Sequence, residues 1–203
     1  MNEVFAYLLP GMMYFWVMFI GQGPLQEILQ EKETHVLPRI LAAPVTLSQF
    51  LIAKMARCFF LCGIVMLLLI LLSAVLFNLR WGNLFLLLLM IGACAWSMTG
   101  LLAVVYSLAK TREQANTLSS IILLICAMVG GSMFPFEDLP GFLQTIGQFT
   151  PNRWGVLVLQ GVLRAKPLAQ LWAPLACLMV IGLTGSLVAF FLFRRHLIYG
   201  HGR

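Results

Sequence analysis

The sequence has little charge: only 10% of its 203 residues are Asp, Glu, Lys or Arg, well below the roughly 25% that is usual for a soluble domain. Five apolar stretches contain none of these residues: 4–22, 58–77, 84–109, 115–134 and 172–193. At about 1.5 Å per helical residue, each can cross about 30 Å of hydrocarbon. The sequence therefore predicts an all-α integral membrane protein with five transmembrane helices, in one domain.

Two further absences and the placement of the cysteines narrow the function. The chain has no G-x-x-x-x-G-K-[ST] phosphate-binding loop, so it cannot itself be an ATPase. The stretches hold no ionisable groups of the kind that proton- or sodium-driven carriers need at membrane depth. All five cysteines lie in or at the ends of the stretches, where they pack as small apolar residues. We therefore predict no catalytic residue, no metal site and no cofactor bound by this chain.

The thirteen Lys and Arg residues predict the orientation. If the stretches alternate across the membrane, nine fall on one side (Lys32, Arg39, Lys54, Arg57, Lys110, Arg112, Arg194, Arg195 and Arg203) and four on the other (Arg80, Arg153, Arg164 and Lys166). The positive-inside bias then places the amino terminus outside and the carboxyl terminus in the cytoplasm. The net charge of +6 is explained by topology, so we expect no nucleic-acid partner. No positively charged signal region precedes the first stretch. This predicts either that an upstream helix is missing or that the chain is a short natural version that inserts with an unusual start.

Two connections are long and two are short. The short ones, 78–83 and 110–114, predict antiparallel neighbours on either side of them. The long ones are a cytoplasmic segment, 24–57, and an outer segment, 135–171. Connections of that length usually have structure and a task of their own.

The cytoplasmic segment begins as an amphipathic helix, with Leu25, Ile28 and Leu29 on one side. Pro38 and Pro44 are expected to interrupt it. Thr46 followed by Gln49 forms a capping box, which predicts a new helix that runs into the second stretch. The pattern fits either a helix lying at the membrane interface or a docking surface for a cytoplasmic partner.

The outer segment is apolar but too short to cross the membrane, and prolines interrupt it. It fits a re-entrant hairpin, whose backbone must be shielded from lipid by the rest of the protein. It fits equally a pair of amphipathic helices that lie flat on the outer surface, with Trp154 as an interfacial anchor. The residues that mark this hairpin are Phe134, Pro135, Pro140, Pro151 and Trp154.

Two motifs resemble a known family. Residues 31–33, 37–45 and Lys54 resemble the cytoplasmic "E-x-E-x-G-T-L-x-x-L-L-x-x-P-V … G-K" stretch of type 2 ABC export permeases. Residues 131–135, with Leu139-Pro140, Pro151 and Trp154, are similar to that family's "G-x-x-F-P … L-P … P-x-x-W" segment. Two residues depart from the pattern: His35 replaces a usual Gly, and Pro38 stands in a usual helical turn. The family usually has one more helix before the first stretch, in line with the suspected missing helix.

The resemblance implies a bacterial inner-membrane subunit that pairs with a second permease subunit, as a homodimer or heterodimer, and with cytoplasmic ABC ATPase subunits that bind ATP and Mg. The cargo would be a drug, lipid or polysaccharide. By resemblance, the ATPase-coupling residues are Glu31, Lys32, Glu33 and Arg39 as polar contacts and Leu37, Ile40 and Leu41 as apolar anchors. Membrane lipids would surround the spans.

The side chains themselves suggest a path for a bulky apolar cargo, because thioethers and aromatic rings adapt to irregular shapes. The candidates are Met12, Phe15, Trp16, Phe19 and Met128. Two other functions stay open. A scaffold or immunity protein would bind partners without transport. A membrane-embedded lipid-modifying enzyme would need clustered acids and bases, which the separation of His35 from Glu137 and Asp138 makes less probable.

Overall fold

The computed structural model describes residues 2–41 and 46–199. Within these ranges the chain is helical and has no strand, which confirms the predicted all-α class. The elements are α1 (Asn2–Ile20), α2 (Gly23–Glu33), α3 (Val36–Leu41), α4 (Leu47–Phe77), α5 (Leu84–Leu108), α6 (Arg112–Val129), the 3-10 helix η1 (Phe136–Asp138), α7 (Gly141–Gly147), α8 (Pro151–Leu163) and α9 (Leu168–Tyr199).

Three of the described helices are long and apolar enough to cross a membrane: Leu47–Phe77, Leu84–Leu108 and Leu168–Arg195. The predicted count of five is therefore not confirmed. The stretch 115–134 extends past the end of its helix, because α6 begins with polar residues at Arg112 and ends at Val129. Gly130 and Gly131 follow, and Gly131 has a φ of 80°, a backbone conformation that ends the helix.

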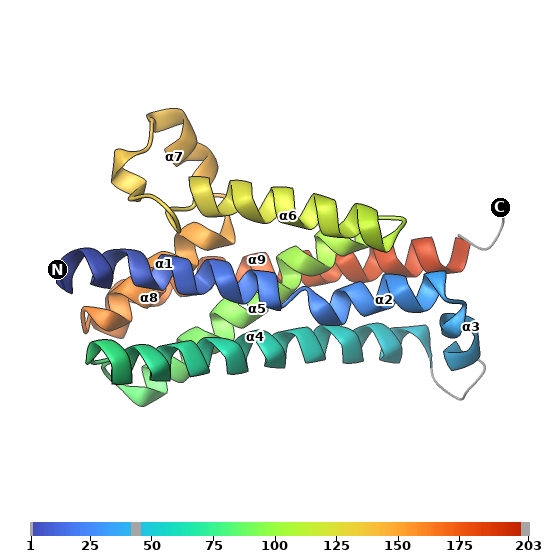
Figure 1. The fold of residues 1–203 in the computed structure, drawn as a ribbon, viewed down its shortest axis with the longest axis horizontal. Helices are drawn as coiled ribbons and strands as arrows, with labels where there is room; N and C mark the ends of the chain where they lie inside the picture. The colour runs from blue at the N-terminus through green and yellow to red at the C-terminus, as the bar shows by residue number, and fades with distance from the viewer. Residues whose placement is uncertain (1, 42–45, 200–203) are drawn as a thin grey trace.

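The long helices run along the long axis of the molecule, and the two long connections lie at opposite ends (Figure 1). One end carries the amino terminus, the α4–α5 connection, α7 and α8. The other carries α3, the start of α6 and the carboxyl-terminal end of α9. The two short connections join antiparallel helices, as predicted, and the segments rich in Lys and Arg gather at the α3 end.

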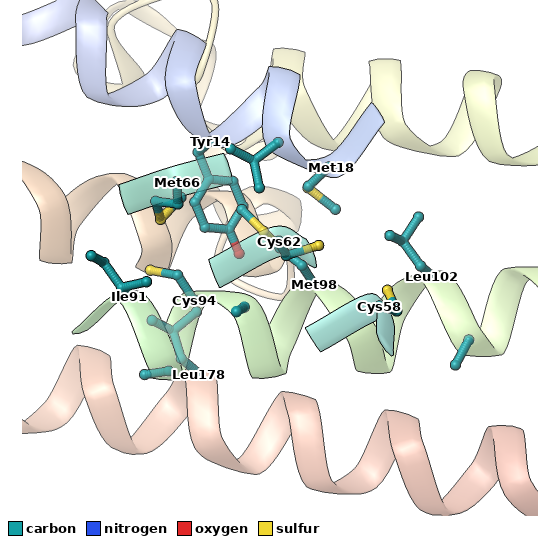
Figure 2. Packing of buried hydrophobic residues seen from close by; sticks show 14 of the residues in the cluster. Tyr14, Met18, Cys58, Cys62, Met66, Ile91, Cys94, Met98, Leu102 and Leu178 are labelled. Carbon is teal, nitrogen blue, oxygen red and sulfur yellow. The ribbon is translucent and has the colours of Figure 1, made fainter. Parts of the chain in front are cut away.

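Close backbone contacts hold the centre of the bundle together. A Cβ atom on Gly100 in α5 would lie only 2.7 Å from the Gly182 carbonyl oxygen in α9, so glycine lets these helices touch. Gly155 in α8 likewise leaves room for the ring of Tyr14 in α1. Figure 2 shows this ring among the sulfur atoms of Cys62 and Cys94. The Tyr14 hydroxyl lies 3.0 Å from Ser97 Oγ, which satisfies both groups in the core.

Candidate functional site

The most distinctive feature outside the bundle core is an arm at one end of the molecule, formed by α2 and α3 (residues 23–41). Helix α1 breaks only over Gly21 and Gln22 and continues as α2, which lies nearly in line with it (Figure 1). Leu25, Ile28 and Leu29 are buried, which confirms the predicted apolar face. A displacement of α2 would therefore act directly on α1.

The arm turns sharply between α2 and α3. Thr34 caps the end of α2, and His35 has a φ of 55°, in the left-handed region that favours glycine. This explains the glycine in the family pattern that His35 replaces. The interruption expected at Pro38 thus occurs earlier in the chain. Pro38 itself is accommodated in the first turn of α3, where a backbone N–H has no intrahelical partner. Pro44 lies outside the described residues.

The predicted capping box opens α4 and is confirmed. The Thr46 N–H donates to Gln49 Oε1 (2.9 Å), and the Gln49 N–H donates to Thr46 Oγ1 (3.3 Å). From there α4 continues without a break past Lys54 and Arg57 into its apolar part. The same rigid helix therefore carries both the basic residues beside the arm and a membrane-crossing stretch.

Four charged side chains fasten the arm to α4, and we call this group the ion brace: Glu27 and Glu31 of α2 with Lys54 and Arg57 of α4. Lys54 Nζ donates to Glu27 Oε2 and to Glu31 Oε1, each at 2.8 Å, and Arg57 Nη1 donates to Glu27 Oε2 at 2.6 Å. The Lys54 side chain is only 13% exposed, whereas that of Arg57 is 61% exposed. Lys54 is thus the centre of the brace.

The electrostatics of the brace favour the charged form of Glu27. The hydrogen bond from Lys54 holds the pKa of this carboxyl below its usual range. Partial burial opposes this effect, and the positive charges of Lys54 and Arg57 add to it. The only local pattern in the sequence that indicates the brace is the spacing of Glu27 and Glu31, one helical turn apart in α2. Its basic partners are more than twenty residues away, so local spacing could not reveal them.

The arm also contacts α6. Glu33 Oε1 accepts a hydrogen bond from the backbone N–H of Arg112 (2.7 Å), in the first turn of α6. A carboxylate is favourable there because the amino-terminal end of a helix carries partial positive charge. The arm is therefore joined covalently to α1 and by polar contacts to α4 and α6.

A buried polar cluster lies where α1 passes into α2. Gln22 is 5% exposed, and its Oε1 accepts from the Ser119 hydroxyl of α6 (2.7 Å) and lies 3.0 Å from the Tyr106 hydroxyl of α5. Buried hydrogen bonds of this kind fix the relative position of the helices that supply them. The junction of bundle and arm is thus held by polar contacts as well as by apolar packing.

The predicted ATPase-coupling residues lie in different surroundings. Glu31 and Glu33 are engaged with α4 and α6. Leu37 is only 1% exposed because it packs in the hydrophobic core of this chain, and Ile40 is half-buried against the same core. Lys32 is half-buried and Arg39 exposed, and the side chain of Leu41 lies outside the described set. We call the turn between α2 and α3 the elbow, and its exposed residues include His35, Val36 and Arg39.

In the outer segment the prolines start helices. Pro135 precedes η1, Pro140 precedes α7, and Pro151 is the first residue of α8. Phe134 is half-exposed, and the Trp154 Nε1–H donates to the Gln148 carbonyl oxygen (2.7 Å).

The two helices of the outer segment differ in their surroundings. Most residues of α8 are buried, and α8 packs against α1, α5 and α9. In contrast, Phe142 and Phe149 project from α7 and the residues just after it, and are 66% and 82% exposed. The bundle shields α8 and leaves α7 uncovered.

The predicted path residues lie on two helices that touch, α1 and α6. Met12 and Trp16 line a groove of about 510 Å³ between α1 and α4. Phe15 and Phe19 continue along α1, with ring centroids 4.8 Å apart in an edge-to-face arrangement. Met128 is half-exposed on α6. Four of these residues thus lie along one part of α1, and Met128 belongs to a helix that contacts α1.

Three helices that are long and apolar enough to cross a membrane indicate a multi-pass membrane protein. The chain belongs to the ABC-2 family transporter proteins, whose family model matches residues 1–191. It is similar to the linearmycin resistance permease protein LnrN of Bacillus subtilis (strain 168), with 26% identity over 147 residues, which cover 72% of this chain and 38% of LnrN. The match therefore spans about two fifths of that relative's length.

Proposed function

We propose that this chain is the transmembrane subunit of an ATP-driven ABC-2 type exporter, moved through its arm by a separate cytoplasmic ATPase that binds ATP and Mg. The family match supports the transporter class. The observation that carries the coupling role is the ion brace, because it makes α2 and α4 move together. On this proposal the α3 end faces the cytoplasm of a bacterial inner membrane, and the amino terminus lies outside.

The ATPase would press on the exposed elbow formed by His35, Val36 and Arg39. The buried side chain of Leu37 would anchor α3 to the bundle. A force on the elbow would then displace α2 and would not detach α3 from the bundle. Glu31 and Glu33 would pass the motion to α4 and α6. Hydrogen bonds to charged groups contribute about 1.5 to 3 kcal/mol, more than the roughly 0 to 1 kcal/mol of exposed ion pairs. The low exposure of Lys54 places the brace nearer the stronger class.

The cargo path is proposed to follow the surface of α1, from the groove that it forms with α4 to its contact with α6. Helices α1 and α6 would complete five membrane spans. Met12, Trp16 and Met128 would contact a hydrophobic or amphipathic compound there. A second permease subunit would close the path from the other side. Because the named relative is a resistance permease, a toxic compound is our first candidate for the cargo. On the outer side, α8 would be re-entrant and α7 would lie at the interface.

The proposal is tested by reconstituting the chain with its ABC ATPase in proteoliposomes and measuring ATP hydrolysis together with ATP-dependent movement of a fluorescent amphiphile. Arg39→Glu should reduce transport per ATP hydrolysed, because it reverses a charge on the exposed elbow. Arg80→Glu makes the same change at the opposite end and should leave the ratio unaltered. If the wild-type chain moves no amphiphile and leaves ATP hydrolysis unchanged, the scaffold or immunity function is favoured instead.

A further inference from the structure

A second groove lies away from the proposed cargo path, between α4 and α9. It has a volume of about 420 Å³ and is floored by Trp96 and Thr99 of α5. Its two walls consist of Ile52, Met55, Ala56 and Phe59 of α4, and of Leu183, Ser186, Leu187 and Phe190 of α9. The side chains of Ile52, Leu183 and Leu187 are each at least half exposed. The groove therefore opens sideways towards the bilayer. Its volume lies in the range of roughly 300 to 1,000 Å³ typical of sites for small ligands.

One polar group in this apolar groove has no partner. Ser186 is 7% exposed, and its hydroxyl makes no hydrogen bond to the described residues. The other hydroxyl, that of Thr99, donates to the Ala95 carbonyl oxygen (2.8 Å). An unsatisfied hydroxyl is unfavourable at membrane depth. Because Ser186 has no hydrogen bond to lose, rotation about χ1 can turn its oxygen towards a ligand at little cost.

A positive charge continues one wall of the groove. Leu183, Leu187 and Phe190 lie on one face of α9 at helical spacing, and Arg194 is the next residue on that face. Arg194 is exposed and belongs to the carboxyl-terminal part of α9, the part of this helix that lies at the α3 end of the bundle (Figure 1). The groove therefore has an apolar body, a hydroxyl in its wall and a cation one helical turn beyond Phe190, on the α9 wall.

We propose that this groove binds one anionic phospholipid from the leaflet at the α3 end, with an acyl chain in the apolar body, an ester carbonyl accepting from Ser186 and the phosphate beside Arg194. A lipid fits each of these three features, and the sideways opening gives it access from the bilayer. The proposal rests on the proposed function only for naming that leaflet cytoplasmic.

Native mass spectrometry of the purified full chain tests this site, with phosphatidylglycerol or phosphatidylcholine added to the detergent solution. The wild type should retain one phosphatidylglycerol in preference to phosphatidylcholine. Leu187→Trp fills the groove and should abolish this retention. The matched control is Val188→Trp, the next residue of α9, which is similarly exposed but does not line the groove. It should retain the lipid as the wild type does.

Two milder variants separate the parts of the site. Ser186→Ala should weaken retention of both lipids about three- to tenfold, as expected for one lost hydrogen bond. Arg194→Gln should reduce the retention of phosphatidylglycerol about fivefold and that of phosphatidylcholine by less, because phosphatidylcholine carries no net charge.

Equal lipid retention by Leu187→Trp and Val188→Trp would overturn the proposal, since any bound lipid would then be non-specific. The proposal would also be overturned if Leu187→Trp left lipid retention unchanged but dissociated a dimer of the chain. The groove would then be an interface between copies. No ATPase is present in this assay, so its outcome is independent of whether the chain supports ATP-driven export.

Discussion

Replacing Lys54 by Met gives the sharpest test of the ion brace. Met keeps much of the length and apolar volume of the side chain but removes both charge-assisted hydrogen bonds, to Glu27 and Glu31. Glu27 keeps Arg57 as a partner. Glu31 loses its cation, and its second oxygen, Oε2, is already buried without a hydrogen bond in the structure. Most of the cost should therefore arise at Glu31.

The size of the expected loss of stability follows from the burial of Lys54 and Glu31. Lys54 is 13% exposed and Glu31 24% exposed at the side chain, which places the contact between exposed pairs, worth roughly 0 to 1 kcal/mol, and buried pairs, whose disruption costs about 3 to 5 kcal/mol. We expect a loss of about 2 kcal/mol, which for a chain of this size lowers the unfolding temperature by about 4 to 8 °C. Thermal unfolding in detergent, followed by tryptophan fluorescence, measures the shift.

The same variant should separate ATP hydrolysis from transport, because α2 and α4 would no longer move together. Lys166→Met is the matched control, since it removes the same charge from the exposed connection between α8 and α9, away from the brace. A double-mutant cycle between Lys54→Met and Glu31→Gln should give a coupling free energy of about 1 to 2 kcal/mol. If Lys54→Met and Lys166→Met had equal unfolding temperatures and equal transport per ATP, the reasoning would be refuted.

Three further predictions use other features of the fold. His35→Gly should raise the free energy of unfolding by about 1 kcal/mol, because φ at this position is left-handed, and His35→Ala should not; chemical denaturation measures both. Because the folded pKa of Glu27 is lowered, its stabilising contribution is present above the usual carboxyl range and is lost as the pH falls through the lowered value; unfolding temperatures measured between pH 7 and 3 should fall less steeply in Glu27→Gln. Gly100→Ala should prevent normal folding, since its Cβ would meet the Gly182 backbone, whereas Gly92→Ala in the same helix has open space and should be neutral or stabilising; gel filtration after expression distinguishes them.

Local features of the fold could be predicted from the sequence because their causes are local. The apolar face of Leu25, Ile28 and Leu29 and the capping box at Thr46 each depend on residues a few positions apart, and both are present. The elbow shows the limit of this reasoning. Proline is a strong helix breaker, so the interruption was expected at Pro38, but a proline is tolerated in a first turn and the left-handed residue is His35.

The features that matter most for the proposed function depend on contacts between distant segments. The brace joins residues 27 and 31 to residues 54 and 57, and Glu33 meets the start of α6. The lipid groove needs three helices to enclose Ser186. Charge counts and hydrophobic periodicity contain no information about such pairs, so the sequence could place the arm but not show what fastens it.

The central claim, that the elbow receives force from an ATPase, is tested most directly by placing a photo-crosslinking amino acid at Val36 in membranes that contain the chain and its ABC ATPase. The account predicts a crosslink to the ATPase whose yield changes when the ATPase is trapped with ATP and vanadate, and none from the same probe at Arg80. Absence of any crosslink at Val36, or a yield that does not respond to trapping, would contradict it.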